Sequence, residues 1–461
     1  MRFTAILFCL FALAVSLSAK QAEVVIREPS DWMAYVSCPS GLSYSVTDYG
    51  SVSLNRIFWK NTALLADFRL PREGEFNRLS FEYTSAGPLR MTATYLTEGA
   101  PVSDEVFLEA GSKTFSFLIK GWDKGKKAAS LRSVALSPLK GSGEAVIRDV
   151  KTETVPLPDG DTCYISNGSL KVGVKLLWGG GVSYFEDRRC RIEGLSNLIN
   201  RADEGRLIQQ SYYGDKAGPD YEPGTAFGVR WTYNPVQGGD SFRNPSRLID
   251  FTKKGSSVYI KAQPMDWALD GRITPSYMEN TYMLKGNVLE VRNRFVDFSG
   301  MEHSVHNQEL PAFYTVSYLG RFVCYQGEKP WTGDVLTERD GLPFWGGGYV
   351  PECHFEISPS NTESWSAWMS AGEDYGIGLY TPGVTLLVAG RHMYNGSKDP
   401  ADNATNYTAP LIAAALKPFV PLEYSYLITA GSLKDIRSRF SARKGFADNF
   451  AGYKLRRYAF N

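Results

Sequence analysis

The sequence predicts an all-β protein made of two antiparallel sandwich domains. The composition of the 461-residue chain supports this, because 13% aromatic residues, 44 Gly and 24 Pro are typical of β-rich chains with many turns. Hydrophobic and polar residues also alternate with a period of two, as at Leu79, Phe81 and Tyr83. Residues 162–461 show little helical periodicity. Together these patterns favour half-buried strands over a helical bundle.

The first predicted domain covers residues 24–155. Alternating segments at 115–119 and 145–150 read as strands, and Gly, Pro and Asp between the strands favour turns. A run of such strands indicates a β-sandwich. Residues 156–161 are rich in proline and acidic residues, and we interpret them as a stiff linker because proline restricts both itself and the residue before it.

The second predicted domain covers residues 162–461. Two alternating runs at 282–295 flank Lys285-Gly286-Asn287, which predicts a hairpin. Residues 425–429 read as another strand, and 432–440 as a short late helix. A β block of this length is too large for a small sandwich and predicts a very large antiparallel one.

The N-terminus reads as a secretory signal peptide at residues 1–19. Arg2 supplies the positive charge, an apolar run covers 5–15, and small residues lead to Ala19. We therefore expect a secreted or periplasmic protein. Beyond residue 19 no apolar stretch approaches the length needed to span a bilayer, so we expect no membrane span in the mature chain.

The cysteines argue against a zinc ribbon and leave open one disulfide between distant strands. No CxxC spacing occurs, and an odd number of cysteines follows the signal segment, which leaves at least one thiol free or paired with another molecule. The disulfide pairing cannot be deduced from the sequence. The residues concerned are Cys38, Cys163, Cys190, Cys324 and Cys353.

Charge and missing motifs argue against several functional classes. With 50 Lys and Arg against 49 Asp and Glu, the chain lacks the basic excess of a nucleic-acid binder. It also lacks a phosphate-binding loop, an HExxH helix, a GxSxG elbow and a dinucleotide fingerprint. We therefore predict no cofactor and no metal site. A structural calcium ion stays open as a possibility, although no EF-hand-like spacing appears in the sequence.

The strongest candidate for acid–base chemistry is the segment 302–311. It holds His303 and His306, two of four histidines in the chain, together with Glu309. We predict catalytic roles for His306 and Glu309, and a substrate contact for Asn307. A metal site would need these side chains on one helical turn, whereas flanking strands favour an extended chain in which residues three apart face opposite sides. A purely structural role is the other alternative.

A second candidate segment, 206–214, concentrates amides and phenols. Such groups offer the donors and acceptors that the vicinal hydroxyls of a sugar require. A buried strand with satisfied amides is an equally good reading. The candidates here are Arg206, Gln209 and Gln210 for substrate binding, and Tyr212 and Tyr213 for catalysis.

Three further places carry suitable side chains. Trp231 and Gln237 lie in a polar and aromatic loop and are predicted substrate contacts. Asp266 stands beside Trp267, and an apolar neighbour can raise a carboxyl pKa enough to make it a general acid, with the indole as a sugar contact. Glu423 begins the last strand as a third carboxylate candidate, although an exposed strand-edge carboxylate is the simpler reading.

The order of these segments resembles the galactose-mutarotase-like β-supersandwich. Residues 170–185 look like the opening strand and glycine turn of that fold. The hairpin at 282–295 followed by 306–314 is similar to the hairpin and His-bearing strand, and Glu423 stands where mutarotases carry their catalytic Glu. Residues 24–155 resemble a carbohydrate-binding-type jelly roll. The resemblance implies a jelly-roll sandwich followed by a supersandwich, a platform that also occurs in glycoside hydrolases and polysaccharide lyases.

The leading hypothesis is a secreted enzyme that cleaves glycosidic bonds in a polysaccharide or oligosaccharide. As a hydrolase it needs a proton donor and a second carboxylate, for which Glu309, Asp266 and Glu423 are the candidates, with His306 as an alternative acid. As a lyase it needs a base beside a uronate carboxylate and groups that neutralise that carboxylate. Tyr212 or Tyr213, with the side chains at 206, 209 and 306, would serve.

Two alternatives stay open. An aldose 1-epimerase-like enzyme would use His306 on the ring oxygen and Glu423 on the anomeric hydroxyl. A non-catalytic glycan-binding protein would use the same aromatic and amide groups for affinity alone.

Overall fold

The computed structural model describes residues 24–26, 43–46, 52–55, 75–97, 101–119, 122–123, 126–139, 145–346, 349–357, 363–384 and 386–456. The predicted signal peptide at 1–19 and Cys38 lie outside the described residues.

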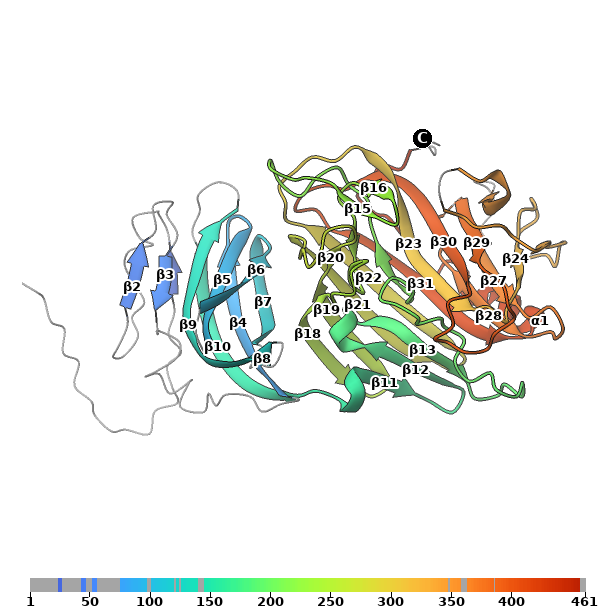
Figure 1. Ribbon diagram of the computed structural model, residues 1–461, viewed down its shortest axis with the longest axis horizontal. Coiled ribbons are helices and arrows are strands. Elements are labelled where there is room, and N and C mark those ends of the chain that lie inside the picture. Colours follow the sequence, from blue (N-terminus) through green and yellow to red (C-terminus); the bar gives the residue numbers. More distant parts are fainter. Residues whose placement is uncertain are drawn as a thin grey trace, which may run out of the picture.

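The N-terminal strands form two sheets that lie side by side as the blue and cyan part of Figure 1. One sheet has the order β1-β10-β4-β7, with bounds Val24–Ile26, Ala145–Pro156, Glu75–Ser85 and Gly111–Ile119. The other has the order β2-β3-β9-β5-β6, with bounds Ser43–Val46, Val52–Asn55, Lys126–Pro138, Leu89–Thr97 and Pro101–Leu108, and β8 (Trp122–Asp123) pairs with β9.

After a 3₁₀ turn at Asp159–Asp161 the chain enters a second set of sheets. A small sheet joins β11 (Thr162–Ser166), β12 (Leu170–Lys175) and β13 (Gly181–Asp187), with a 3₁₀ turn at Leu176–Trp178. Strands β15 (Gly224–Ala226) and β16 (Val229–Trp231) form a separate hairpin.

Two large sheets make up the body of this part, and we call them sheet I and sheet II. Sheet I has the order β20-β17-β14-β23-β30-β29-β26, with bounds Met265–Asp266, Pro235–Val236, Gln209–Ser211, Val305–Val316, Thr405–Ala415, Leu386–His392 and His354–Glu356. Sheet II has the order β18-β19-β21-β22-β31-β28-β27-β24-β25, with bounds Arg247–Lys254, Ser257–Gln263, Ser276–Lys285, Val288–Asp297, Leu422–Gly431, Gly376–Tyr380, Trp365–Met369, Arg321–Cys324 and Thr337–Asp340.

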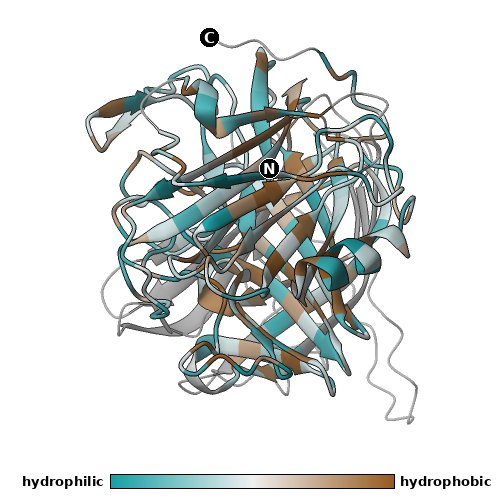
Figure 2. Ribbon diagram, turned by 90° about the vertical axis from the view of Figure 1, so that its right-hand side faces the viewer, coloured by the Kyte–Doolittle hydropathy of each residue, from teal (hydrophilic) through white to brown (hydrophobic). Residues whose placement is uncertain are grey.

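The main core lies between sheet I and sheet II. Leu310 and Ile412 of sheet I belong to the same buried cluster as Val291, Phe295 and Ile428 of sheet II. Figure 2 shows the matching pattern of hydrophobic and hydrophilic bands along the strands. The described strands of both large sheets pair antiparallel, so the predicted all-β class with large antiparallel sheets is confirmed.

Two local predictions are also confirmed. The hairpin predicted at 282–295 is β21–β22, and Gly286 at φ +62° makes its turn. The helix predicted at 432–440 is α1 (Leu433–Ser441), which Ser432 caps by accepting a hydrogen bond from the backbone N–H of Asp435. The helix covers the outer face of sheet II, where Ile436 and Phe440 are buried.

Ion pairs fasten the N-terminal sandwich to sheet II. Arg78 in β4 lies 2.8 Å from the Asp250 carboxylate in β18. Arg294 in β22 lies 2.5 Å from Glu109, which follows β6. Since both pairs are partly shielded from solvent, they fix one sandwich against the other.

Four cysteines can be placed within the described part of the chain. Cys163, Cys190, Cys324 and Cys353 are free thiols there. Among the described residues, no helical segment is long and apolar enough to cross a bilayer.

Candidate functional site

The most suggestive group of polar side chains lies on the outer face of sheet I. In the register of this sheet, Ser211 in β14 pairs with Glu309 in β23, and Glu309 pairs with Leu411 in β30. Directly paired residues point to the same face of a sheet. Leu310, the next residue along β23, belongs to the main core, so Glu309 points away from that core.

Hydroxyl groups surround the Glu309 carboxylate. The Tyr407 hydroxyl donates a hydrogen bond to Glu309 Oε1 at 2.5 Å. The side chains of Tyr213 and Ser211 also hydrogen-bond to this carboxylate. Burial raises the pKa of the Glu309 carboxyl above its usual range, and the three hydroxyls only partly oppose that rise. As a whole residue, Glu309 is half-buried rather than fully enclosed.

Aromatic rings form a bed around Glu309. Trp345 stacks on Tyr407 with centroids 4.5 Å apart and planes at 23°, and Tyr314 lies 4.8 Å from Tyr407. Gly390 in β29 lets Trp345 approach this closely, because a Cβ at that position would lie 2.7 Å from the Pro343 carbonyl oxygen and 3.0 Å from Trp345 Cβ.

A second stacked pair extends the bed toward β14. The rings of Tyr213 and Trp231 lie 6.4 Å apart with planes at 22°. Tyr213 therefore links the carboxylate of Glu309 to the indole of Trp231.

A second carboxylate lies at the edge of this bed. Asp203 Oδ2 is 3.1 Å from Arg206 Nε. The pKa of the Tyr314 hydroxyl is raised first by burial and then by the negative charges of Glu309 and Asp203, so both carboxylates lie within electrostatic range of Tyr314. The pKa of His392 is lowered by burial and by the Arg206 charge, while Asp203 opposes the change, which places this imidazole in the same group.

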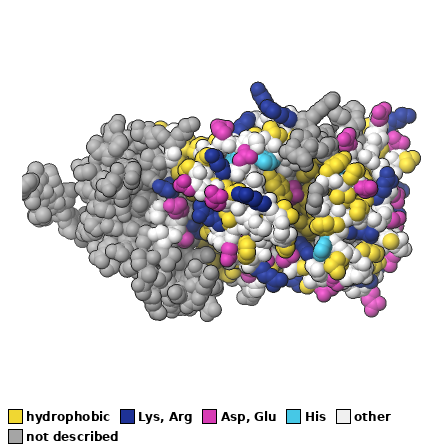
Figure 3. Space-filling view, turned by 45° about the horizontal axis from the view of Figure 1, so that its top comes forward, with side chains coloured by type: hydrophobic (Ala, Val, Ile, Leu, Met, Phe, Trp, Pro, Cys, Tyr) yellow, Lys and Arg dark blue, Asp and Glu magenta, His cyan; other side chains and the backbone are white. Residues whose placement is uncertain are grey.

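Exposed apolar side chains surround the same region. Phe344 is half exposed and lies 4.8 Å from Trp345 and 5.7 Å from His392, ring centroid to ring centroid. Phe227, in the β15–β16 hairpin, is 82% exposed and packs at 6.2 Å against Trp267. Figure 3 shows hydrophobic side chains gathered between charged ones on one face of this part of the molecule. Phe344 and Phe227 therefore add exposed apolar surface beside the polar group around Glu309.

The structure brings together part of the set predicted from sequence. Glu309, Tyr213 and Trp231 share the site, and Arg206 lies at its edge. Asn307 pairs with Ala413 and faces the same side of sheet I as Glu309, two residues along β23.

Five participants were not predicted. They come from distant segments whose residue types carry no local signal, so only the pairing of β23 with β14 and β30 and the packing of loops reveal them. They are Asp203, Tyr314, Trp345, His392 and Tyr407.

His306 lies on the other side of β23 from Glu309. Its Nε2 is 3.1 Å from Asp215 Oδ1 and 3.1 Å from the Ser304 hydroxyl. Burial acts to raise the Asp215 pKa, but hydrogen bonds from Ser304 and the nearby His306 hold it below its usual range. These hydrogen bonds hold the loop after β14 against the start of β23.

His303 has a similar structural setting. Its Nδ1 accepts the backbone N–H of Asp215 at 3.0 Å, and its ring stacks on Tyr233 at 5.6 Å. Its side chain is fully buried, so it has no access to a ligand.

Asp266 forms a separate buried group. The Tyr221 hydroxyl donates to Asp266 Oδ2 at 2.7 Å, and burial raises the pKa of this carboxyl to about 6. The Trp267 ring instead lies against Gly205. The direction of the shift agrees with the prediction for Asp266, but its cause is burial in the loop packing rather than the neighbouring indole.

Glu423 and Tyr212 lie away from Glu309. Glu423 belongs to sheet II, is 65% exposed, and sits 3.0 Å from Arg294. Tyr212 is buried in the main core, where its ring lies 4.2 Å from that of Phe295.

The three predicted glutamine contacts are engaged in the fold. Gln209 Oε1 accepts the backbone N–H of Gly238 at 2.6 Å, and Gln237 Oε1 accepts the backbone N–H of Gln210 at 2.9 Å. The Gln210 amide donates to Asn280 Oδ1 at 2.9 Å. These bonds match the alternative reading of a buried strand with satisfied amides.

No cluster of three or more His, Cys, Asp or Glu side chains suited to a metal ion occurs in the described part of the chain. A structural calcium ion therefore stays a hypothesis without a located site.

No protein-family model matches the sequence, and no curated protein matches it. Several solved structures are similar to part of the chain. A galactose mutarotase related enzyme from Lactobacillus acidophilus is 12% identical, with a TM-score of 0.37, and the match covers 59% of this chain and 97% of that one. A galactose mutarotase-like protein from Lactobacillus casei gives the same identity and TM-score, over 59% of this chain and 100% of that one.

An α-galactosidase from Lactobacillus brevis is 9% identical, with a TM-score of 0.34, over 60% of this chain and 40% of the α-galactosidase. Galactose mutarotase-like proteins, the group that the sequence resembles, are thus among the solved structures similar to this chain.

Proposed function

We propose that the chain is a carbohydrate-active enzyme that hydrolyses glycosidic bonds in an oligosaccharide or polysaccharide at the outer face of sheet I. The observation that carries this proposal is the Glu309 carboxyl, which combines a raised pKa, three hydroxyl neighbours and partial exposure in a bed of aromatic rings. A carboxyl whose pKa lies above the usual range suits a general acid, because it holds its proton to a higher pH than an ordinary glutamate does. Aromatic rings supply flat apolar surfaces for the C–H faces of sugar rings.

The proposed reaction uses Glu309 and Asp203 in complementary roles. The protonated Glu309 donates its proton to the glycosidic oxygen as the bond to the anomeric carbon breaks. Asp203, ion-paired with Arg206 at 3.1 Å, accepts a proton from the water that attacks the anomeric carbon. Solvent then returns the proton to Glu309 and removes the one on Asp203.

Hydrolysis fits this geometry better than elimination does. The pKa of Tyr213 is raised well above its usual value by burial and by the Glu309 charge, and its hydroxyl donates to Glu309, so it is a poor base. His306 lies on the other face of β23, and the Gln209 amide is engaged by backbone. An epimerase pair of His306 and Glu423 would join two residues that lie in different sheets.

The test is turnover on a panel of plant, algal and host polysaccharides, following new reducing ends and the absorbance of unsaturated uronates together. We expect reducing ends without absorbance from the wild-type chain. Glu309→Gln keeps the shape of the site but removes the ionisable carboxyl, and should lower kcat by about 100-fold or more. Glu356→Gln, an exposed glutamate of sheet I, is the matched control and should be unaffected.

Each other outcome points elsewhere. Absorbance together with reducing ends would mean elimination. Full turnover by Glu309→Gln would remove Glu309 from the reaction. Glycan binding without turnover in the wild-type chain would favour a binding protein whose aromatic bed serves affinity alone. We also propose export of the protein, on the pattern at residues 1–19, which secretion of a reporter fused to this segment would test.

A further inference from the structure

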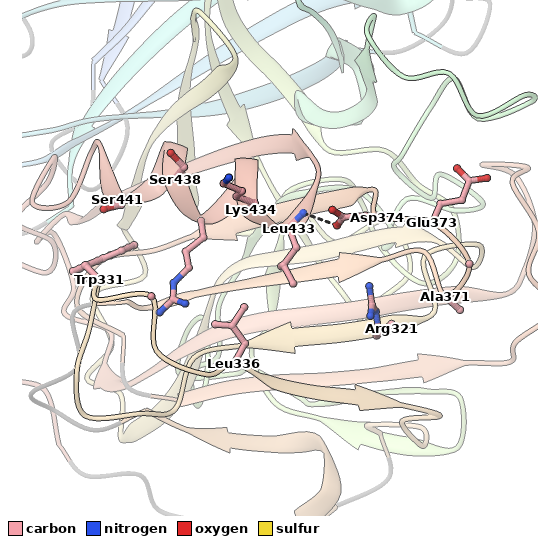
Figure 4. Close-up of a pocket in the computed structure, with 13 residues that line it drawn as sticks. Arg321, Trp331, Leu336, Ala371, Glu373, Asp374, Leu433, Lys434, Ser438 and Ser441 are labelled. Carbon is pink, nitrogen blue, oxygen red and sulfur yellow. Dashed lines mark hydrogen bonds between the residues drawn. The ribbon is translucent and has the colours of Figure 1, made fainter.

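A pocket of about 830 Å³ opens on the outer face of sheet II, at the side of α1 (Figure 4). One face of α1 forms its upper wall, and the segments 331–336 and 371–374 complete it. Sheet II separates this pocket from the main core, and Glu309 lies beyond that core on the outer face of sheet I. The pocket is therefore independent of the site at Glu309.

Trp331 lines this pocket in a backbone conformation that is costly for a bulky residue. Its φ is +63°, in the left-handed region, and such positions cost about 1–3 kcal/mol and cluster at binding sites. The buried carboxylate of Glu363 holds this conformation by accepting the backbone N–H of Trp331. Glu363 also accepts from Trp365 Nε1 at 2.9 Å and from Arg437 Nη2 at 2.7 Å.

The indole is held in orientation as well as in position. Its ring meets Tyr380 edge to face, with centroids 5.9 Å apart and planes at 84°. Arg437 Nη1 donates to the carbonyl of Asp334 at 2.6 Å, which fastens the same loop to α1. The wall of the pocket is thus preorganised, and little entropy is lost when a ligand binds to it.

The remaining lining is partly apolar. Leu336 and Leu433 face the pocket beside Trp331, as Figure 4 shows. Val335, next to Leu336, is 83% exposed. A partly apolar lining favours a ligand with apolar surface of its own.

The charges around the pocket nearly balance. Arg321 is paired with Glu338 at 3.1 Å, and Arg437 with Glu363. That leaves the Lys434 ammonium and the carboxylates of Glu373 and Asp374, which form no ion pair among the described residues. Asp374 Oδ1 accepts the backbone N–H of Leu433 at 2.9 Å. One cation beside two carboxylates opposes a strongly anionic ligand, and together they offer both donors and acceptors.

We propose that this pocket is a second carbohydrate-binding site, which takes a neutral sugar ring. The indole of Trp331 packs against the C–H face of the ring, and Lys434, Glu373 and the Ser438 hydroxyl hydrogen-bond to its hydroxyl groups. Such a site would hold a polymer on the side of the molecule opposite Glu309 and raise the local concentration of substrate.

The experiment measures binding of the full chain to an array of neutral and acidic oligosaccharides, followed by calorimetry on the neutral oligosaccharide that binds most tightly. Ser438→Trp fills the pocket from an exposed position of α1 and removes no core contact. Trp331→Ala removes the wall, and Lys434→Ala removes the free cation. Lys444→Ala, an exposed lysine just beyond α1, is the matched control.

We expect Ser438→Trp and Trp331→Ala to weaken neutral-sugar binding at least tenfold, and Lys434→Ala to weaken it less. Lys444→Ala should leave the calorimetric affinity unchanged. The proposal is overturned if the wild-type chain binds no neutral oligosaccharide of the array, or if Ser438→Trp binds as tightly as wild type. Binding confined to acidic oligosaccharides and lost in Lys434→Ala would also overturn it. Turnover by Glu309 is a separate measurement, so failure of either proposal leaves the other standing.

Discussion

Glu309 owes its chemistry to its neighbours rather than to its own sequence context. Burial against the aromatic bed raises its pKa, whereas the hydroxyls of Tyr407, Tyr213 and Ser211 stabilise the ionised form and limit the rise. The balance leaves a carboxyl that is protonated over a wider pH range than an ordinary glutamate. The protonated form of Glu309 is the one that acts in the proposed reaction.

Removing one of these hydroxyls should raise the pKa of Glu309. Tyr407→Phe deletes the 2.5 Å bond that favours the carboxylate, so the pKa of Glu309 rises further. Because a general acid works only while protonated, the alkaline limb of the kcat/KM profile should move up by about one pH unit. Tyr314→Phe, which removes a hydroxyl that does not bond to Glu309, is the control and should leave the limb in place. A downward shift in Tyr407→Phe would contradict the role assigned to Glu309.

The position of α1 on sheet II depends on close packing against a glycine of β28. Gly378 in β28 faces α1, where a Cβ would lie 2.5 Å from Ile436 Cγ2 and 3.0 Å from the Phe440 ring. The absence of a side chain there allows the helix to lie flat on sheet II. The helix in turn supplies the upper wall of the second pocket.

Gly378→Ala should therefore lift or distort α1. The added methyl group overpacks a buried contact, and the free energy of unfolding should fall by about 1–3 kcal/mol. Urea denaturation of the variant and wild-type chains measures this difference. Gly168→Ala adds the same atom where nothing lies within 4 Å, and it should change stability little. Equal effects of the two substitutions would show that packing against α1 is not the cause.

At the scale of the whole molecule, Arg294 ties the N-terminal sandwich to sheet II. It lies 2.5 Å from Glu109 of the first sandwich, and 3.0 Å from both Glu279 and Glu423 of sheet II. Burial opposes ionisation of Glu109, but Arg294 and Lys113 lower its pKa to about 2. This pairing therefore stabilises the fold above the ordinary glutamate pKa, and the contribution is lost as pH falls toward 2.

Arg294→Ala should leave Glu109 and Glu279 partly buried without their shared cation. We expect the free energy of unfolding at pH 7 to fall by about 2–4 kcal/mol, and the difference from wild type to shrink as the pH approaches 2. Arg292→Ala removes a cation from the same strand that is 63% exposed, and should cost under about 1 kcal/mol. Urea titrations at pH 7 and pH 3 test both variants. An unchanged difference at the two pH values would rule out the ion pair as the source.

The fold class and several elements could be predicted from local patterns in the sequence. Period-two alternation identified the strand-rich chain and the hairpin that became β21–β22, and residues 432–440 were read as the short helix that became α1, because these signals are local. The sequence also singled out Glu309, from the histidine-bearing segment 302–311, and Tyr213, from the amide- and phenol-rich segment 206–214, because such clusters are recognisable by residue type.

Which of these side chains meet depends on long-range strand pairing, which the sequence patterns did not reveal. The pairing of β14, β23 and β30 placed Glu309 beside Ser211 and Tyr407, and put His306 on the opposite face of the same strand. The same assembly left Glu423 in another sheet as a partner of Arg294. Sequence alone could not supply this, because strand neighbours far apart in the chain are chosen by burial of whole faces, and a shift of one residue exchanges the two faces.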